Sequence, residues 1–196
     1  MKKFFPVLQY MNIPNMITTV GLVFGIAACY FLLIEGSLRW ALVCLSLAMF
    51  MDLVDGYVAE KLGQQTEFGQ YVDTLVDFFI CCIIPILLVY LFVGSHFVLL
   101  AALVFYVACG LWRLAYYNAR EADNFFVGLP VPGAMLLVIM AVWSVVYFYM
   151  PSWVVYAALV SAGFLMVSFV RLEKYGLWQK GLWVLGVLFF VMVMFS

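Results

Sequence analysis

The chain has 196 residues, of which 69% are hydrophobic and 10% charged, and its mean hydropathy is +1.18. Water-soluble domains average about 45–50% apolar and about 25% charged residues, and a fold of this size cannot hide so much apolar surface from water. The formal net charge of −1 gives no electrostatic reason to bind nucleic acid. Composition therefore excludes a soluble enzyme, a nucleic-acid-binding protein and a disordered chain, and indicates an integral membrane protein.

Apolar runs of roughly the 20 residues that cross a bilayer follow one another along the chain. These runs are apolar on both faces, so they predict helices rather than the alternating strands of an outer-membrane barrel. The connections are short, and we expect one domain over residues 1–196, an all-α polytopic bundle of six to eight spans with seven as the best count. The expected spans are 16–34, 38–59, 69–93, 97–118, 133–149, 153–170 and 181–195. The last run is short and begins after the charged segment 171–180, and Pro85 is expected to kink the third span.

The basic residues predict the orientation of these spans. If the N-terminus lies in the cytoplasm, eight of the nine Lys and Arg residues fall at cytoplasmic ends, and only Arg39 falls outside. The eight are Lys2, Lys3, Lys61, Arg113, Arg120, Arg171, Lys174 and Lys180. We therefore expect a protein integral to the inner (cytoplasmic) cell membrane. Seven spans place the C-terminus outside, whereas an interfacial last segment would leave it inside.

Acidic residues are concentrated in one stretch. Six of the ten lie between positions 52 and 77, and the four aspartates among them fall within expected spans. Each charge at membrane depth costs about 2.5–3.5 kcal/mol even on a lenient scale, so something must compensate. Asp52 and Asp55 are three residues apart, and Asp73 and Asp77 are four apart, so each pair shares one helix face. The connection between the two helices is short, which predicts that the four carboxylates converge near the cytoplasmic surface.

Converging carboxylates without basic partners favour hard divalent cations, namely Mg²⁺ or Mn²⁺, with Ca²⁺ also compatible. Four carboxylates suit two ions about 3.5–4 Å apart, the arrangement used for phosphoryl transfer. Gly56 and Gly69 leave room beside the aspartates for a ligand or for the partner helix. The residues alone also allow a cation or proton transporter, although such carriers usually hold their carboxylates near the midplane.

The stretch from Asp52 to Asp77 reads D-x2-D-G-x2-A-E-x8-G-x3-D-x3-D. It resembles the signature of the CDP-alcohol phosphotransferases, D-x2-D-G-x2-A-R-x8-G-x3-D-x3-D, at seven of eight fixed positions and with the same spacing. Three further segments, residues 13–18, 110–118 and 126–134, are similar to motifs of the bacterial and archaeal phosphatidylserine synthases, one branch of that family. Residues after about 135 show no resemblance to this branch that supports an inference.

The resemblance implies a reaction. CDP-diacylglycerol, or an archaeal analogue, would give its phosphatidyl group to the hydroxyl of a small alcohol, L-serine in this branch, and release CMP. It implies two divalent cations on Asp52, Asp55, Asp73 and Asp77, with Asp77 as the catalytic base. The family's nucleotide-binding positions correspond to Asp52, Gly56, Ala59, Thr66 and Gly69. It also implies a homodimer surrounded by membrane lipids.

Two departures from the family pattern concern the acceptor. Glu60 and Tyr116 stand where the family has arginines, and glutamate cannot make the bidentate phosphate contact of arginine. Substrate and phosphate contacts are then expected from Asn15, Thr18, Lys61, Arg113, Asn118 and Arg120. Arg113 could instead be a snorkelling helix-end arginine, and Asn118 a helix terminator. A different acceptor (glycerol phosphate, inositol phosphate or choline), a transporter and a non-catalytic relative remain alternatives.

Overall fold

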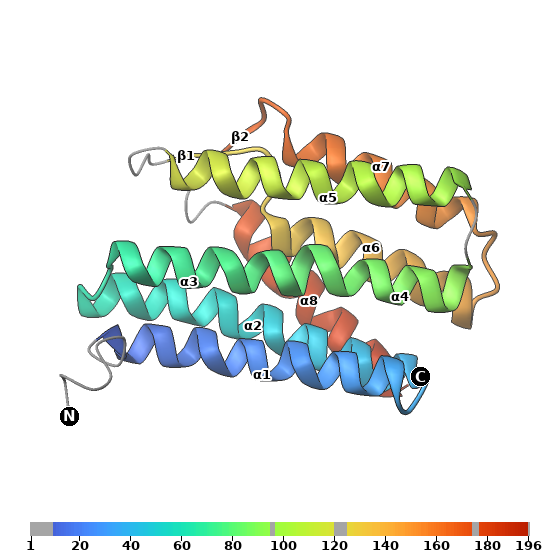
Figure 1. Cartoon of the computed structure of the whole chain (residues 1–196), viewed down its shortest axis with the longest axis horizontal. Helices are drawn as coiled ribbons and strands as arrows, with labels where there is room; N and C mark the ends of the chain where they lie inside the picture. The colour runs from blue at the N-terminus through green and yellow to red at the C-terminus, as the bar shows by residue number, and fades with distance from the viewer. Residues whose placement is uncertain (1–9, 95–96, 120–124, 174–176, 196) are drawn as a thin grey trace.

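The structure is a computed structural model, and it describes residues 10–94, 97–119, 125–173 and 177–195. Long helices lie side by side along one axis (Figure 1). They are α1 (Ile13–Leu33), α2 (Leu38–Leu62), α3 (Glu67–Asp77), α4 (Ile84–Val93), α5 (Phe97–Asn118), α6 (Val131–Tyr147), α7 (Trp153–Met166) and α8 (Leu177–Phe195). A π-helical segment, η2 (Phe78–Ile83), joins α3 to α4. Two short strands, β1 (Phe125–Val127) and β2 (Arg171–Glu173), pair antiparallel.

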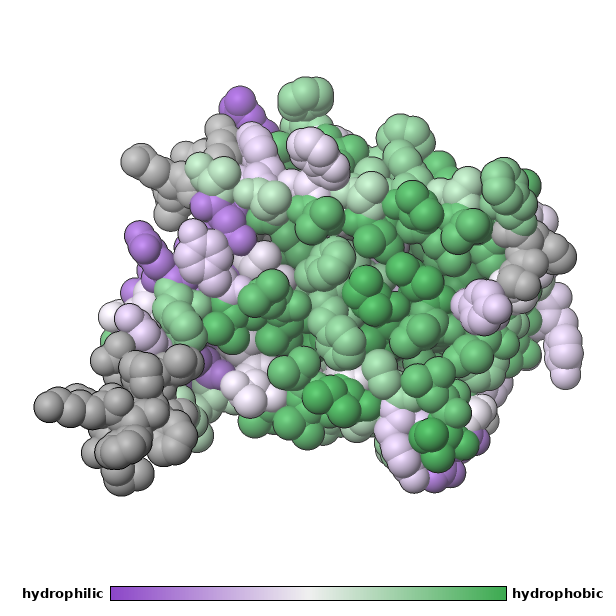
Figure 2. Space-filling view, in the orientation of Figure 1, coloured by the Kyte–Doolittle hydropathy of each residue, from purple (hydrophilic) through white to green (hydrophobic). Residues whose placement is uncertain are grey.

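The expected all-α membrane architecture is confirmed. Four helical stretches are long and apolar enough to cross a membrane, and three shorter apolar helices follow them. The long stretches are Ile13–Leu33, Leu38–Leu62, Glu67–Val93 and Phe97–Asn118, and the shorter helices are Val131–Tyr147, Trp153–Met166 and Lys180–Phe195. Each expected span therefore corresponds to a helix over most of its length. The outer surface is hydrophobic across the middle of the bundle, and hydrophilic residues gather towards the end that carries the α2–α3 connection (Figure 2).

The boundaries of the last two expected spans were wrong by about one helical turn. The sixth expected span, 153–170, corresponds to α7, which ends at Met166. It stops there because the chain turns to bond the segment before α6: the Leu165 carbonyl accepts from the Leu129 N–H at 2.9 Å, and the Val170 carbonyl accepts from the Gly128 N–H at 2.8 Å. Helix α8 starts at Leu177, four residues before the expected start. The β1–β2 pairing was not predicted.

The α2–α3 connection is short and well capped. Helix α2 ends at Gly63, whose φ of +62° is the left-handed conformation that glycine adopts without strain. The Thr66 hydroxyl caps α3 by accepting a hydrogen bond from the Gly69 N–H at 3.0 Å. Asn12 caps α1, and its amide also donates to the Gln64 carbonyl at 3.4 Å. The beginning of α1 is thereby held against the connection, and the aspartates of α2 and α3 face each other near it.

The third span passes Pro85 through a π-helical turn. In η2 the Ile84 N–H bonds to the Phe79 carbonyl, five residues back instead of four. Pro85 then occupies the first turn of α4, where its missing N–H is tolerated. The perturbation expected from Pro85 therefore takes the form of a change in helical register directly after Asp77.

Candidate functional site

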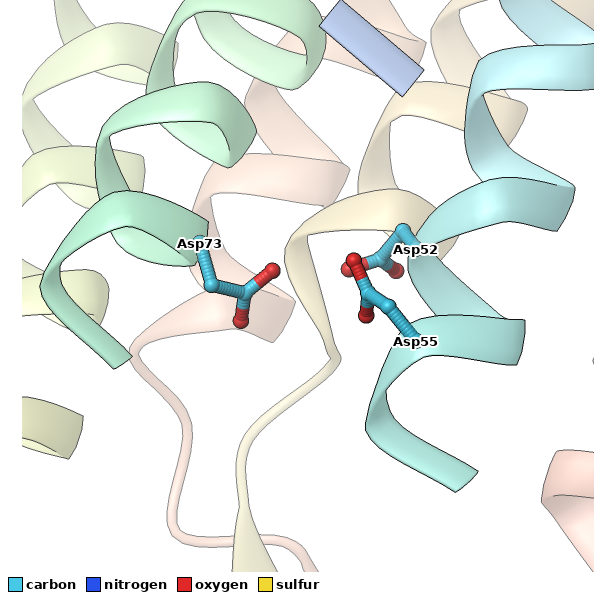
Figure 3. A group of neighbouring side chains, drawn as sticks. All are labelled: Asp52, Asp55 and Asp73. Carbon is cyan, nitrogen blue, oxygen red and sulfur yellow. The ribbon is translucent and has the colours of Figure 1, made fainter. Parts of the chain in front are cut away.

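Three aspartates from α2 and α3 form a compact cluster. One carboxylate oxygen each from Asp52, Asp55 and Asp73 can be chosen so that all three lie within 4.8 Å of one another. Asp52 and Asp55 come from successive turns of α2, and Asp73 extends from α3 towards them (Figure 3). The i, i+3 spacing on α2 places its two carboxylates on the face that meets α3.

Asp77 lies beside this cluster. All four aspartates line one small cavity, whose apolar walls come from α1, α2, α3 and η2. The walls are formed by Thr18, Gly21, Ala48, Met49, Val76, Ile80 and Cys81. Asp77 lies one turn after Asp73 on α3, and its side chain lines this cavity together with Asp52. The two helices therefore bring together the four carboxylates of the sequence motif.

The chemistry of these donors fits divalent cations. In the part of the chain that the structure describes, no lysine or arginine forms a salt bridge with any of the four carboxylates. Asp55 is only 5% exposed, so water cannot stabilise its charge freely. A cluster of oxygen donors with little solvent and no bonded cationic side chain is the environment that Mg²⁺ or Mn²⁺ completes.

Thr18 belongs to the carboxylate cluster itself. Its hydroxyl donates to Oδ2 of Asp55 with an oxygen–oxygen distance of 2.5 Å, and Thr18 is 5% exposed. Such a buried hydrogen bond restricts the rotation of the Asp55 side chain. Thr18, which is predicted to contact the substrate, thus bonds an expected metal ligand in the structure.

The predicted nucleotide-binding positions differ in their surroundings. A Cβ built on Gly56 would meet no atom within 4 Å, so the backbone beside Asp55 faces open space. A Cβ on Gly69 would lie 2.7 Å from Oδ1 of Asn15, so this glycine lets α1 and α3 approach. The Asn15 amide donates to the Tyr10 carbonyl at 2.8 Å. Ala59 lies half-buried on the last turns of α2, and Thr66 is the cap of α3 described above.

The predicted phosphate and acceptor contacts are spread over the same end of the bundle. Lys61 is exposed and lies over the Tyr57 ring at 5.7 Å. Arg113 is 8% exposed, its guanidinium lies 5.0 Å from the Tyr117 ring, and its Nε has no hydrogen-bond partner. This burial argues against a guanidinium that snorkels to the surface. Arg120 lies outside the described residues.

Asn118 ends α5 and contacts the acid-bearing helix. Its amide donates to the Thr74 hydroxyl at 2.9 Å. Thr74 was not predicted, although its position directly after Asp73 could have indicated a role beside the cluster. Tyr106 was also missed: its hydroxyl donates to the Cys81 carbonyl at 2.8 Å. A tyrosine inside a long apolar run is too common for sequence reasoning to single it out.

Comparison with known proteins connects this site to a family. The sequence pattern described as CDP-alcohol phosphatidyltransferase matches residues 11–164. The chain is 31% identical to the CDP-diacylglycerol–serine O-phosphatidyltransferase of Methanocaldococcus jannaschii over 172 residues. This aligned region covers 87% of this chain and 78% of that protein. The enzyme of the same name from Bacillus subtilis is 32% identical over 134 residues, 66% of this chain and 75% of that protein. The Helicobacter pylori enzyme is 28% identical over 136 residues, 66% of this chain and 56% of that protein. The family match spans all four clustered aspartates and most of the helical bundle, and this chain belongs to the CDP-alcohol phosphatidyltransferase family.

Proposed function

We propose that the protein transfers the phosphatidyl group of CDP-diacylglycerol to the hydroxyl of L-serine, giving phosphatidylserine and CMP. Family membership supports the donor and the type of reaction, and the names of relatives near 30% identity support serine as acceptor. The observation that carries the proposal is the cluster of Asp52, Asp55 and Asp73 oxygens within 4.8 Å, with Asp77 in the same cavity.

Asp52, Asp55, Asp73 and Asp77 would hold two divalent cations, Mg²⁺ or Mn²⁺. When bound, such ions neutralise the pyrophosphate and the charge that develops as its phosphorus–oxygen bond breaks. Thr18 holds Asp55 in one orientation through the 2.5 Å hydrogen bond. The open backbone at Gly56 gives a flat cytosine ring a surface to approach, with Ala59 one turn further along the helix.

Asp77 is the proposed general base. Its carboxylate takes the proton of the acceptor hydroxyl, and the hydroxyl oxygen bonds to the phosphorus that carries the diacylglycerol. The bond from that phosphorus to the bridging oxygen breaks, and CMP leaves with the bonding electrons. The shared cavity of Asp77 with Asp52, Asp55 and Asp73 supports this role, because donor phosphate and acceptor would meet beside the carboxylate cluster.

Arg113 is the proposed partner of the serine carboxylate. It is buried, and its Nε has no hydrogen-bond partner. Lys61 would supply positive charge at the rim, and Asn15 would contribute a polar group there. Glu60 is exposed near the same rim, where it disfavours an acceptor with its own phosphate. For that reason the second candidate is an acceptor that is cationic, such as choline, or that carries no charge.

We also propose that the site faces the cytoplasm. Lys61, Arg171 and Lys180 belong to the end of the bundle that carries the carboxylate cluster, and Arg39 belongs to the opposite end. This asymmetry is the one that the positive-inside rule describes. The homodimer implied by the resemblance stays a prediction.

Release of CMP tests the reaction. Purified protein is incubated with CDP-diacylglycerol, Mn²⁺ or Mg²⁺, and separately serine, glycerol phosphate, inositol phosphate or choline. We expect CMP with serine, its loss on chelation with EDTA, and its return on adding either metal. CMP with another alcohol but not with serine would contradict the acceptor alone. No CMP with any of these alcohols would contradict the proposed transfer.

Asp77→Asn tests the base. The amide keeps the shape of the side chain but cannot accept the proton, so turnover should fall by about 10²–10⁴-fold while binding of a CDP nucleotide remains within a fewfold of the wild type. Steady-state CMP release and nucleotide titration measure the two effects. Wild-type turnover in this variant would show that another group takes the proton.

A further inference from the structure

One face of α5 packs against the helix that carries Asp73 and Asp77. Tyr106, Gly110 and Arg113 are spaced i, i+4 and i+7, which places them on the same side of α5. A Cβ on Gly110 would lie 2.5 Å from Sγ of Cys82 in η2, so glycine is what allows the two helices to approach here. Tyr106 is completely buried at this contact.

Pro85 removes one donor that the Cys81 carbonyl would have in a regular α-helix. In a regular helix the carbonyl of Cys81 would accept from the N–H four residues later, but that residue is Pro85, which has no N–H. The Tyr106 hydroxyl donates to this carbonyl at 2.8 Å from the neighbouring helix. The bond is buried within a membrane span, where no water competes for it.

A second hydrogen bond joins α5 to α3 at the residue directly after Asp73. Asn118 donates to the Thr74 hydroxyl at 2.9 Å, and Thr74 directly follows Asp73. Tyr106 bonds Cys81, which lies four residues after Asp77 and lines the same cavity. The two bonds from α5 therefore bracket residues 74–81, with Asp77 between them and Asp73 directly before them.

The bracketed segment needs such support because it runs into a π-helical turn. A π-helical turn holds one residue more than an α-helical turn, and its reversion to an α-helix would shift the register by one residue. A shift of one residue rotates the preceding side chains by about 100° about the helix axis relative to α4. Asp73 and Asp77 would then leave the face that meets Asp52 and Asp55.

We propose that Tyr106 is a positioning residue of the active site: its hydrogen bond to the Cys81 carbonyl, with the Asn118–Thr74 bond as the second support, holds the π-helical register that directs Asp73 and Asp77 towards α2. This inference rests on the proposed function for its effect on turnover, but its effect on metal binding can be measured without any reaction.

Tyr106→Phe is the direct test because it removes the hydroxyl and keeps the ring. Mn²⁺ binding to the purified protein is titrated by electron paramagnetic resonance, and CMP release is measured over a range of Mn²⁺ concentrations. We expect the Mn²⁺ dissociation constant to rise about tenfold and kcat to fall by about 10–100-fold, as for other residues that orient metal ligands. KM for serine should stay within twofold. Tyr30→Phe is the matched control: it removes a tyrosine hydroxyl bonded to Glu35 at 3.2 Å, at the opposite end of the bundle.

Wild-type Mn²⁺ affinity in folded Tyr106→Phe would overturn the proposal, as would an equal loss of affinity in Tyr30→Phe. A lower melting temperature with unchanged Mn²⁺ affinity would also overturn it, because Tyr106 would then serve stability alone. If Tyr106→Phe does not fold, Asn118→Ala decides: it should weaken Mn²⁺ binding about threefold or more, and wild-type affinity would refute the proposal. Mn²⁺ binding by the wild type without CMP release from any alcohol would contradict the proposed function, and the Mn²⁺ titrations would still decide the role of Tyr106.

Discussion

At the scale of single residues, the clearest feature is the hydroxyl of Thr18 on a carboxylate of the neighbouring helix. Asp55 is buried, and a buried carboxylate without hydrogen-bond donors carries a large desolvation cost. The Thr18 bond offsets part of that cost and selects one rotamer of Asp55. A polar residue of α1 thus contributes to the carboxylate cluster without occupying a ligand position.

Thr18→Val tests this role, because valine keeps the branched shape and removes the donor. We expect the Mn²⁺ concentration for half-maximal CMP release to rise about 10–100-fold, since Asp55 is no longer oriented. Thr18→Ser retains a hydroxyl and should remain within a fewfold of the wild type. A valine variant that matches the serine variant would show that the hydrogen bond does not matter for metal activation.

At the scale of elements, the β1–β2 pairing joins the segment between α5 and α6 to the segment between α7 and α8. Both segments lie at the end of the bundle that carries the acidic cluster. Val127 pairs with Arg171, and the next residue, Gly128, bonds the Val170 carbonyl. Gly128 has a φ of +76°, and a Cβ there would lie 2.2 Å from the Met166 carbonyl oxygen. The F-V-G-L-P segment, which resembles a phosphatidylserine synthase motif, therefore has a structural reason for its glycine: only glycine fits against the end of α7.

Gly128→Ala should destabilise the fold more than an alanine at a comparable glycine. Both Gly128 and Gly36 have positive φ, which costs a non-glycine residue about 1–2 kcal/mol. Gly36 has no atom within 4 Å of a built Cβ, whereas Gly128 meets backbone, so overpacking adds about 1–3 kcal/mol at Gly128 alone. Thermal unfolding of the detergent-solubilised variants measures the difference. Equal melting temperatures for the two variants would show that the loop moves aside at little cost.

At the scale of the whole molecule, the two ends of the described chain lie at opposite ends of the bundle. Helix α1 starts near the α2–α3 connection, and α8 ends near the α1–α2 connection, where the Arg39 guanidinium donates to the Met194 carbonyl (Figure 1). A chain that crosses a membrane an odd number of times ends on the side opposite to the one where it begins. The bond from Arg39 also satisfies a carbonyl in the last turn of α8, which has no helical partner.

Reporter fusions test this topology in cells. Alkaline phosphatase at the C-terminus should be active, because it would lie outside the cytoplasm, whereas a green fluorescent protein at the N-terminus should fluoresce inside. The exchanged fusions serve as controls and should be silent. A C-terminal green fluorescent protein that fluoresces would mean that α8 does not cross, and that the chain has an even number of spans.

Composition and local spacing were enough to predict the class of the protein, the order of its spans and the pairing of its aspartates. These features depend on composition and on spacings within single helices, such as Asp52 to Asp55 and Asp73 to Asp77, which local geometry converts directly into shared faces. Helix ends were predicted less well where long-range contacts stop a helix, as at Met166.

Only the tertiary structure decided which residues support the carboxylates. Thr18 and Asp55 are 37 positions apart, Tyr106 and Cys81 are 25 apart, and Asn118 and Thr74 are 44 apart. No periodicity links such positions, because their meeting depends on how whole helices pack and rotate against one another. The scarcity of charge marked the site in the sequence, but the neutral hydroxyl and amide groups that hold it in place became visible only when the helices were assembled.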